Sequence, residues 1–319
     1  MATVSWAALG HASPEGVAAL LGDVEPVALI EAIRAAGDDV ILAATHDAAR
    51  GSRVVEGVLR RIGDLAVPSL LAEMDGRVRW ESAARPGEAM TLHLHDGVVE
   101  VETGATAAAD VVVRASDLQL LRLVAGQLDV AVAYLGNQIA ITGASSVALA
   151  LASLFTVDGT TPVTGEPVDV RDIDPVDIAR VLHGVPADHL RSVMASDFRP
   201  VILEEIFERM PAFVNGRKAA GVQITVGFRL TGRPDGEVDR YVLRLRDGQA
   251  TVLAGAAADA VDRQDRHATV TCEAADFLRL VTGHLSAVSG VLRGQLKVRG
   301  DKAAALRLNA AFDIPTAVA

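Results

Sequence analysis

The chain contains an internal repeat. Residues 121–128 read LRLVAGQL and residues 278–285 read LRLVTGHL, an offset of 157 positions. This offset holds without a gap from about residue 111 to residue 155, and offsets of about 148 to 151 relate the preceding parts of the two halves. A short insertion near residues 256–266 explains the change of offset. Ordered self-similarity of this length is typical of a duplicated structural unit, so the sequence predicts one fold built twice.

The repeat also sets the expected domain boundaries. Residues 157–167 are rich in Gly, Pro, Thr and acidic residues and show neither helical nor strand periodicity, which predicts a linker. The two expected units, each with a helical prefix and a sheet domain, are 14–156 (prefix 14–75, sheet domain 76–156) and 168–319 (prefix 168–220, sheet domain 221–319). Because a short linker holds the copies at high effective concentration, we expect them to pair as an intrachain pseudo-dimer.

The second copy shows the expected plan of one unit. Alternating apolar and polar residues predict strands, and turn residues at 234–236 and 247–248 predict hairpins between them. The predicted strands lie near residues 222–230, 241–246, 250–253, 267–272 and 296–299. Strands followed by helices indicate an α+β fold, in which each copy is a five-stranded mixed or antiparallel sheet covered on one face by helices.

Helix signals flank these strands. Asp174 directly before a proline has the arrangement of an N-cap and a first-turn proline. Periodic apolar residues predict a helix over about 200–213 and another over about 274–282, which stops at a glycine. Ser286 is the expected cap of the next short helix, as Asp129 is in the first copy. The final helix is expected to carry Leu306, Leu308 and Phe312.

Composition argues against several classes of function. The net charge is −11 and the pI is near 5.2, which disfavours nucleic acid as a partner and adsorption to anionic lipid surfaces. Aromatic residues make up only 3%, too few for the stacking platforms that bind single strands. No apolar run approaches the roughly 18 residues of a transmembrane helix, and the N-terminus does not resemble a secretory signal, so a cytoplasmic location is expected. Cys272 is the single cysteine, which excludes an intrachain disulfide and a thiolate metal cluster.

Two segments of the second copy resemble a known family. Residues 276–283 read DFLRLVTG and residues 294–301 read GQLKVRGD. They resemble the acidic-aromatic-Leu helix ending in Thr-Gly, and the strand and turn that follow, of sterol carrier protein type 2 domains. The similarity spans about residues 221–312, with Gln295 in place of the usual lysine at a predicted surface position. In the first copy, residues 137–144 keep the apolar alternation but lose the cations and the acidic cap, so the first copy is the divergent one.

The resemblance implies a sheet and helices that enclose an apolar tunnel. In that family the tunnel takes fatty acids, fatty acyl-CoA, sterols or phospholipids without covalent chemistry, and we expect no cofactor. The expected lining in the second copy is Val226, Phe228, Phe277, Leu280, Val281, Leu285, Val288, Leu292, Leu296, Val298, Leu306 and Phe312. The weaker candidates in the first copy are Leu120, Leu123, Val124, Leu128, Leu135, Ile139, Ile141, Leu149 and Phe155. Plain core packing is the alternative explanation for each of them.

Other candidate sites have a simpler explanation. His93 and His95 share one face of a predicted strand at a spacing that can chelate a metal, but no third ligand is evident nearby, which favours a solvated pair. Cys272 occupies an inward strand position and is expected to be a small buried residue instead of a nucleophile. Motifs for dinucleotide binding, P-loops, nucleophile elbows and zinc proteases are absent from the sequence. We therefore expect no metal site and no enzymatic activity in this chain.

Three functions are compatible with the sequence. The leading hypothesis is a carrier that buries and releases a lipid-like ligand, with the second copy as the better candidate. The second is a structural or interaction scaffold with a filled core. The third is an accessory domain that presents a lipid substrate to a partner enzyme. Co-purified lipid, or saturable displacement of a fluorescent fatty acid, would distinguish a carrier from a scaffold.

Overall fold

The computed structural model describes residues 4–65, 75–104, 108–144, 147–148 and 174–314. The chain forms two compact units, residues 1–169 and residues 170–319, called unit 1 and unit 2 below. The predicted linker, residues 157–167, lies outside the described residues, and the predicted limits of prefixes and sheet domains stay a prediction. Within the described segments, each helix is too short or too polar to span a bilayer.

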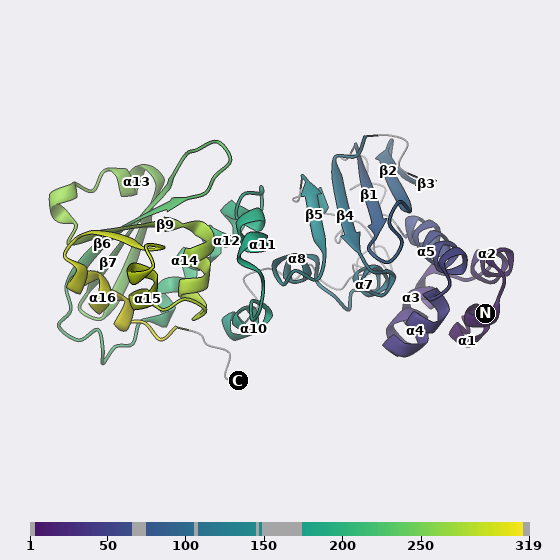
Figure 1. The fold of residues 1–319 in the computed structure, drawn as a ribbon, viewed down its shortest axis with the longest axis horizontal. Helices are drawn as coiled ribbons and strands as arrows, with labels where there is room; N and C mark the ends of the chain where they lie inside the picture. Colours follow the sequence, from purple (N-terminus) through teal and green to yellow (C-terminus); the bar gives the residue numbers. More distant parts are fainter. Residues whose placement is uncertain (1–3, 66–74, 105–107, 145–146, 149–173, 315–319) are drawn as a thin grey trace. The chain divides into compact units, whose positions relative to one another are not determined.

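Helices open unit 1 (Figure 1). They are α1 (Trp6–His11), α2 (Pro14–Gly22), α3 (Pro26–Ala35), α4 (Asp38–Thr45) and α5 (Ala48–Gly63). The helical segment begins before the predicted residue 14, because the Ser5 hydroxyl accepts the N–H of Ala8 and caps α1. Ser13 caps α2 in the same way.

A five-stranded mixed sheet follows in unit 1. Its strands are β1 (Gly76–Ser82), β2 (Ala89–His95), β3 (Val98–Thr103), β4 (Val111–Ala115) and β5 (Ala140–Gly143), in the order β3-β2-β1-β4-β5. β1 and β4 are parallel, and the other neighbours are antiparallel. Helices α7 (Asp117–Val124) and α8 (Val130–Leu135) connect β4 to β5. Asp129 accepts the N–H of Val132 at the start of α8, which confirms the predicted cap.

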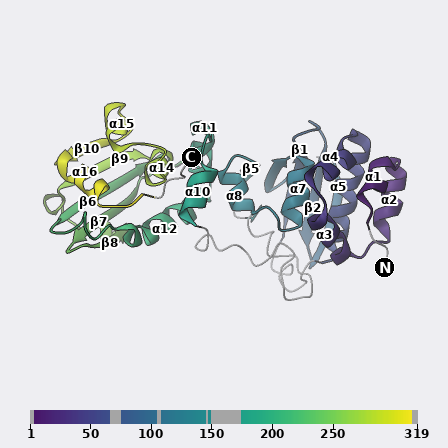
Figure 2. The ribbon, with the colours of Figure 1, turned by 90° about the horizontal axis from the view of Figure 1, so that it is seen from below.

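Unit 2 repeats this plan. Its opening helices are α10 (Pro175–Val181), α11 (Ala187–Val193), α12 (Arg199–Arg209) and the 3-10 helix η2 (Met210–Phe213). Its strands are β6 (Ile224–Thr231), β7 (Asp239–Arg246), β8 (Gln249–Ala254), β9 (Ala268–Glu273) and β10 (Lys297–Gly300). The remaining helices are α13 (Gly255–Asp259), η3 (Arg263–Asp265), α14 (Ala274–Val281), α15 (Ala287–Leu292) and α16 (Lys302–Ala310). α14 and α16 pack on β6 and β9 (Figures 1 and 2).

The two sheets have the same topology and register. The order β8-β7-β6-β9-β10 repeats β3-β2-β1-β4-β5. Trp80 pairs with Met90 on one side and Val113 on the other. Phe228 pairs in the same way with Tyr241 and with Val270, which lies 157 positions after Val113. The predicted α+β fold, with two five-stranded sheets, is therefore confirmed, and each sheet is mixed because it contains one parallel pair.

The insertion near residue 256 distinguishes unit 2. It forms α13 and the turn that follows, and its Ala258 and Val261 pack on Val242 and Leu253. Val242 is the neighbour of Gly227, on the face of the sheet opposite Phe228 and Tyr241. The prediction of helices on one face is thus incomplete for unit 2, because the insertion covers part of the second face.

Three local predictions need correction in unit 2. Ser286 occupies the N-cap position of α15, but its side chain makes no capping hydrogen bond. Phe312 lies after α16, where it forms an isolated bridge with Val214. Gln295 is not a plain surface residue, because its amide donates to the buried carboxylate of Asp276 at 2.9 Å.

Candidate functional site

Four aromatic rings meet inside unit 2. Phe207 of α12 stacks on Tyr241 of β7, with ring centroids 3.7 Å apart. The Phe207 ring centroid also lies 5.0 Å from that of Phe277 of α14 and 6.0 Å from that of Phe228 of β6. The centroids of Phe277 and Phe228 are 5.5 Å apart. These rings occupy the space between the opening helix, the sheet and α14, where the tunnel was predicted. A ligand in this space therefore has to displace rings or lie beside them.

The predicted lining of the second copy divides by burial. Six of its members are buried: Val226, Phe228, Phe277, Leu280, Leu285 and Leu296. Three are half-buried: Val281, Val298 and Phe312. The other three are exposed, namely Val288 (55%), Leu292 (81%) and Leu306 (42%).

The exposure of Val288 and Leu292 has a local cause. α15 packs through Gly290, and a Cβ on that glycine would lie 2.8 Å from the Leu296 side chain. Val288 and Leu292 are two residues before and after Gly290, so they point away from the packed side of the helix. Leu306 lies on the outer side of α16, whose buried residues are Ala304 and Leu308. The expectation that these three line a closed interior is wrong.

The weaker candidates in the first copy lie mostly in the core. The buried members are Leu120, Leu123, Leu135, Ile139 and Ile141. Val124 and Leu128 are half-buried, and Leu149 and Phe155 lie outside the described residues. Core packing and ligand contact both remain compatible with this burial, so their role as a lining stays a prediction.

Unit 1 contains a small, half-open cavity beside Trp80, the residue whose place in the sheet corresponds to that of Phe228 in unit 2. Its lining is Val55, Trp80, Ser82, Arg85, Glu88, Ala89, Met90 and Asp117. Its lining combines apolar side chains with the polar groups of Ser82, Arg85, Glu88 and Asp117, and the space corresponds to about one water molecule. Trp80 Nε1 is buried and has no hydrogen-bond partner among the described residues. Because buried N–H donors are nearly always satisfied, this donor indicates a place for a water or a ligand acceptor.

A buried ion pair closes the polar end of this cavity. Arg85 donates two bonds to Asp117 and one to Glu88, and the Ser82 hydroxyl donates to Asp117 at 3.1 Å. Burial opposes the charge on Arg85, but its bonds to Asp117 and Glu88 outweigh this effect and raise its pKa. Asp117 is thus fully engaged by its neighbours. This arrangement suits a structural anchor better than a catalytic carboxylate.

Sequence patterns did not single out the residues of this cavity or Phe207. Arg85 lies in a turn and Asp117 opens a helix, so only the fold brings them together. Phe207 had a detectable signal, because it lies on the apolar stripe of the helix predicted over about 200–213. Tyr241 had one as well, since it alternates inward in its strand.

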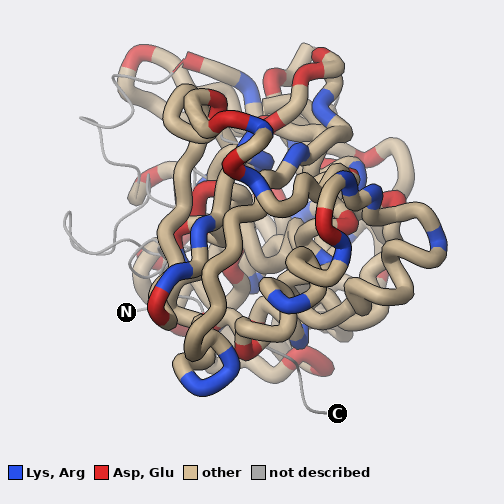
Figure 3. The backbone as a smooth tube through the Cα atoms, turned by 90° about the vertical axis from the view of Figure 1, so that its left-hand side faces the viewer, with Lys and Arg blue, Asp and Glu red and all other residues tan. Residues whose placement is uncertain are grey.

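Cys272 follows the sequence prediction. Cys272 is buried, and burial raises the pKa of its thiol to about 12, which makes it inert near neutral pH. Lys297 and Arg299 are exposed. Along the described chain, Lys and Arg are interspersed with Asp and Glu (Figure 3).

Comparisons with known proteins associate the units with two families. Residues 56–156 match the SCP-2 sterol transfer family. This segment is therefore similar to the SCP-2 family. The predicted resemblance to sterol carrier proteins is therefore confirmed, although the match lies in the first copy, which the sequence patterns suggested to be the divergent one. Residues 193–317 match the family described as alkyl sulfatase C-terminal.

Solved structures show the same two kinds of similarity. The sterol carrier protein 2 like 2 of Aedes aegypti is 22% identical over 36% of this chain and 99% of its own, with a TM-score of 0.28. The sec-alkylsulfatase Pisa1 from Pseudomonas sp. is 19% identical over 43% of this chain, with a TM-score of 0.31. The match spans only 20% of the length of that sulfatase. No curated protein matches the chain.

Proposed function

We propose that the chain binds a lipid-like ligand without converting it, and that the segment similar to the SCP-2 family holds this ligand between its sheet and helices. The observation that carries the proposal is the cavity beside Trp80, whose indole N–H has no partner among the described residues, in a segment that matches a sterol transfer family. The ligand class is an amphipathic molecule such as a fatty acid, fatty acyl-CoA, sterol or phospholipid. No group of the chain has to react for this function.

The chemistry of the cavity supports an amphipathic ligand. Val55 and Met90 offer apolar surface to a hydrocarbon, and each methylene that leaves water contributes about 0.8 kcal/mol. The indole N–H of Trp80 and the Ser82–Arg85 side offer polar contacts to a head group. Since the space is about one water molecule in size, binding requires the helices to move apart from the sheet.

A non-catalytic role agrees with the polar residues present. Among the described residues that line this cavity there is no histidine. Asp117 accepts bonds from Arg85 and Ser82 and is not positioned as a base for a free nucleophile. The ion pair therefore acts as a fixed wall of the binding space.

The test is a titration of the delipidated full-length protein with a fluorescent polyene fatty acid. Trp80 lines the cavity, so it should transfer energy to the bound probe, and the Trp6→Phe variant should keep this signal. Val55→Phe, which fills the cavity, should weaken binding by about tenfold or more, because an overfilled core must shift to admit a ligand. Val201→Phe, at an exposed position of α12 in unit 2, is the matched control.

Three outcomes would contradict the proposal. The first is the absence of saturable binding, and the second is a Kd that Val55→Phe leaves unchanged in a folded protein. The third is energy transfer that disappears in Trp6→Phe. Lipid found by native mass spectrometry in the purified chain would support the carrier independently of the probe.

A second candidate function concerns unit 2. The match of residues 193–317 to an alkyl sulfatase C-terminal family favours an accessory role beside a partner enzyme. Its ring-filled interior also suits a rigid module, so we propose unit 2 as the weaker lipid site. Binding of the probe that survives Val55→Phe and is lost in a Phe277→Ala variant would move the lipid site to unit 2. A cytoplasmic location belongs to the same proposal.

A further inference from the structure

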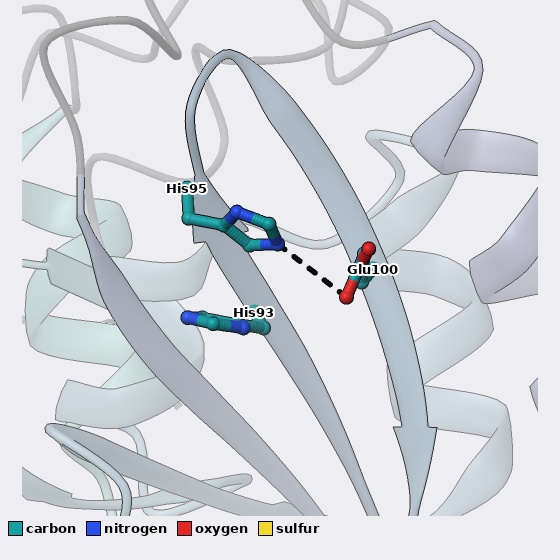
Figure 4. A group of neighbouring side chains, drawn as sticks. All are labelled: His93, His95 and Glu100. Carbon is teal, nitrogen blue, oxygen red and sulfur yellow. Dashed lines mark ion pairs between the residues drawn. The ribbon is translucent and has the colours of Figure 1, made fainter.

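Two histidines and a glutamate meet on the outer face of the unit 1 sheet. His93 and His95 lie on β2, and Glu100 lies on β3 directly opposite His93 (Figure 4). One ligand atom from each residue lies within 4.8 Å of the others. His95 Nε2 is 3.4 Å from Glu100 Oε2, and the two imidazole centroids are 4.2 Å apart. The third ligand that the linear sequence did not reveal is therefore supplied by the neighbouring strand.

The β2–β3 hairpin fixes this arrangement. Asp96 and Gly97 both have positive φ, 48° and 77°, as the two central residues of a type I′ turn require. Such a turn sets the register of its strands, so His93 faces Glu100 in the folded chain. The three side chains thus come from rigid elements and not from a loop.

We infer that His93, His95 and Glu100 bind one divalent transition-metal ion of the zinc class. Imidazole nitrogens and carboxylate oxygens bind zinc at about 2.0–2.2 Å, which places neighbouring ligand atoms about 3.4 Å apart in a tetrahedron. Glu100 is 61% exposed, so its side chain is free to rotate inward and close the remaining distance. Three protein ligands leave a fourth position for water. Magnesium and calcium prefer oxygen ligands throughout and fit this set poorly.

The neighbouring charges both support and oppose the ion. Asp96 Oδ2 is 3.5 Å from His95 Nδ1, so it can orient that ring while the opposite nitrogen faces Glu100. Glu102 lies two residues further along β3 on the same face. Arg77 of β1 pairs with His93 on the other side and adds a positive charge that weakens binding. Arg79, two residues further along β1 on the same face, adds a second positive charge.

Unit 2 provides a built-in comparison for this site. Its equivalent strand positions hold Arg244 and Arg246 on β7, with Thr251 opposite Arg244 on β8. The turn there, Asp247 and Gly248, has the same positive φ values. The same hairpin therefore forms without any of the three ligands, so the fold itself does not require them.

The test is a titration of the tag-free, chelator-treated full-length protein with Zn²⁺, followed by calorimetry, and with Co²⁺, followed by its visible absorption. We expect one ion per chain. His93→Ala and Glu100→Gln should each weaken binding by about tenfold or more. Glu100→Gln keeps the shape of an exposed side chain, so it separates ligand loss from misfolding.

His183→Ala is the control. His183 and His284 form another histidine pair, in unit 2, with ring centroids 6.1 Å apart. This variant should bind Zn²⁺ like the parent chain. The absence of stoichiometric Zn²⁺ binding would overturn the inference. So would full affinity in both His93→Ala and Glu100→Gln, or a loss confined to His183→Ala.

Discussion

At the centre of each sheet, one aromatic residue sits between two neighbouring strands. In unit 1 this residue is Trp80, beside Met90, and a small cavity with an ion pair lies next to it. In unit 2 it is Phe228, beside Tyr241, and Phe207 and Phe277 fill the adjoining space. The same backbone register thus supports two kinds of interior. In unit 1 the Trp80 indole N–H lacks a partner among the described residues and faces a partly polar cavity, and in unit 2 aromatic rings fill the space. The two units thus share a strand order and differ in how the space beside the central strand is filled.

The outer faces of the two sheets differ as well. Unit 1 presents His93, His95 and Glu100, where unit 2 presents two arginines and a threonine. Unit 2 also covers part of its outer face with the insertion that contains α13. These differences are the basis on which we propose a ligand site in unit 1 and a rigid module in unit 2.

The chain offers separate reporters for the two units. Its two tryptophans, Trp6 and Trp80, belong to unit 1, and its single cysteine, Cys272, belongs to unit 2. Tryptophan fluorescence therefore follows the unfolding of unit 1. Labelling of Cys272 follows that of unit 2, because the thiol is buried in the folded state. The predictions on substitutions and on zinc are measured through these transitions, and the prediction on alkaline pH through circular dichroism.

The largest effect is expected from Phe207→Ala. Removing a buried ring between Tyr241 and Phe277 should lower the unfolding free energy of unit 2 by about 3–5 kcal/mol. Cys272 labelling in a denaturant series measures this loss, and the tryptophan transition should not move. Val201→Ala, at an exposed position of the same helix, should change stability by less than about 0.5 kcal/mol. A loss of unfolding free energy below about 1 kcal/mol for Phe207→Ala would show that the interior is loosely packed. Unit 2 would then again be a candidate for the lipid site.

Asp117→Ala should produce the next largest effect, in unit 1. It leaves the buried Arg85 with Glu88 as its remaining carboxylate, at a cost of about 3 kcal/mol. The tryptophan transition should shift to lower denaturant while Cys272 labelling stays unchanged. The control is Glu81→Ala, which breaks the more exposed pair with Arg114 and should cost less than about 1 kcal/mol. Equal losses in the two variants would argue against a buried anchor.

Zinc should stabilise unit 1 alone. At a free Zn²⁺ concentration of about 100 times the Kd, the unfolding free energy of unit 1 should rise by about 2.7 kcal/mol. The tryptophan transition measures the gain, and His95→Ala should abolish it. Stabilisation of both units to the same extent would place the ion elsewhere.

Alkaline pH should weaken unit 2 in particular. Burial raises the pKa of Tyr241 and of Cys272 to about 12, from ordinary values of 10.0 and 9.0. Because the folded state holds these protons more tightly, their contribution is complete below pH 9 and is lost as the pH rises toward 12. The equivalent positions of unit 1 are Met90 and Ala115, which do not titrate. Denaturant unfolding followed by circular dichroism should show the unfolding free energy falling across this range. Tyr241→Phe should reduce the slope of this free energy against pH, and an unchanged slope would exclude Tyr241 as a cause.

Leu292→Ser should have the smallest effect. Leu292 is 81% exposed, so the stability of unit 2 should change by less than about 0.5 kcal/mol. Leu296→Ala, four residues later and buried, should instead cost about 2–5 kcal/mol. Cys272 labelling compares the two. A large loss for Leu292→Ser would mean that α15 turns its outer side inward in solution.

Features encoded in a few neighbouring residues were predictable from the sequence. The Asp-Gly pair at 247–248 predicted a hairpin, and both of its residues have the positive φ values that such a pair favours. Asp129 was expected to cap a helix and does so. The repeat predicted two copies of one sheet, and the strand orders agree. Periodicity and local hydrogen bonding determine these features, so no distant residue is needed to infer them.

The candidate sites were decided by the tertiary structure. Glu100 reaches His93 only through the register of two strands. Phe207 reaches Tyr241 only because an opening helix packs on the sheet, although their positions are far apart in the sequence. Leu292 resembles a core residue in the sequence and is exposed, because Gly290 is the residue through which its helix packs. The sequence by itself determined which elements form, and packing direction and strand register determined which side chains meet.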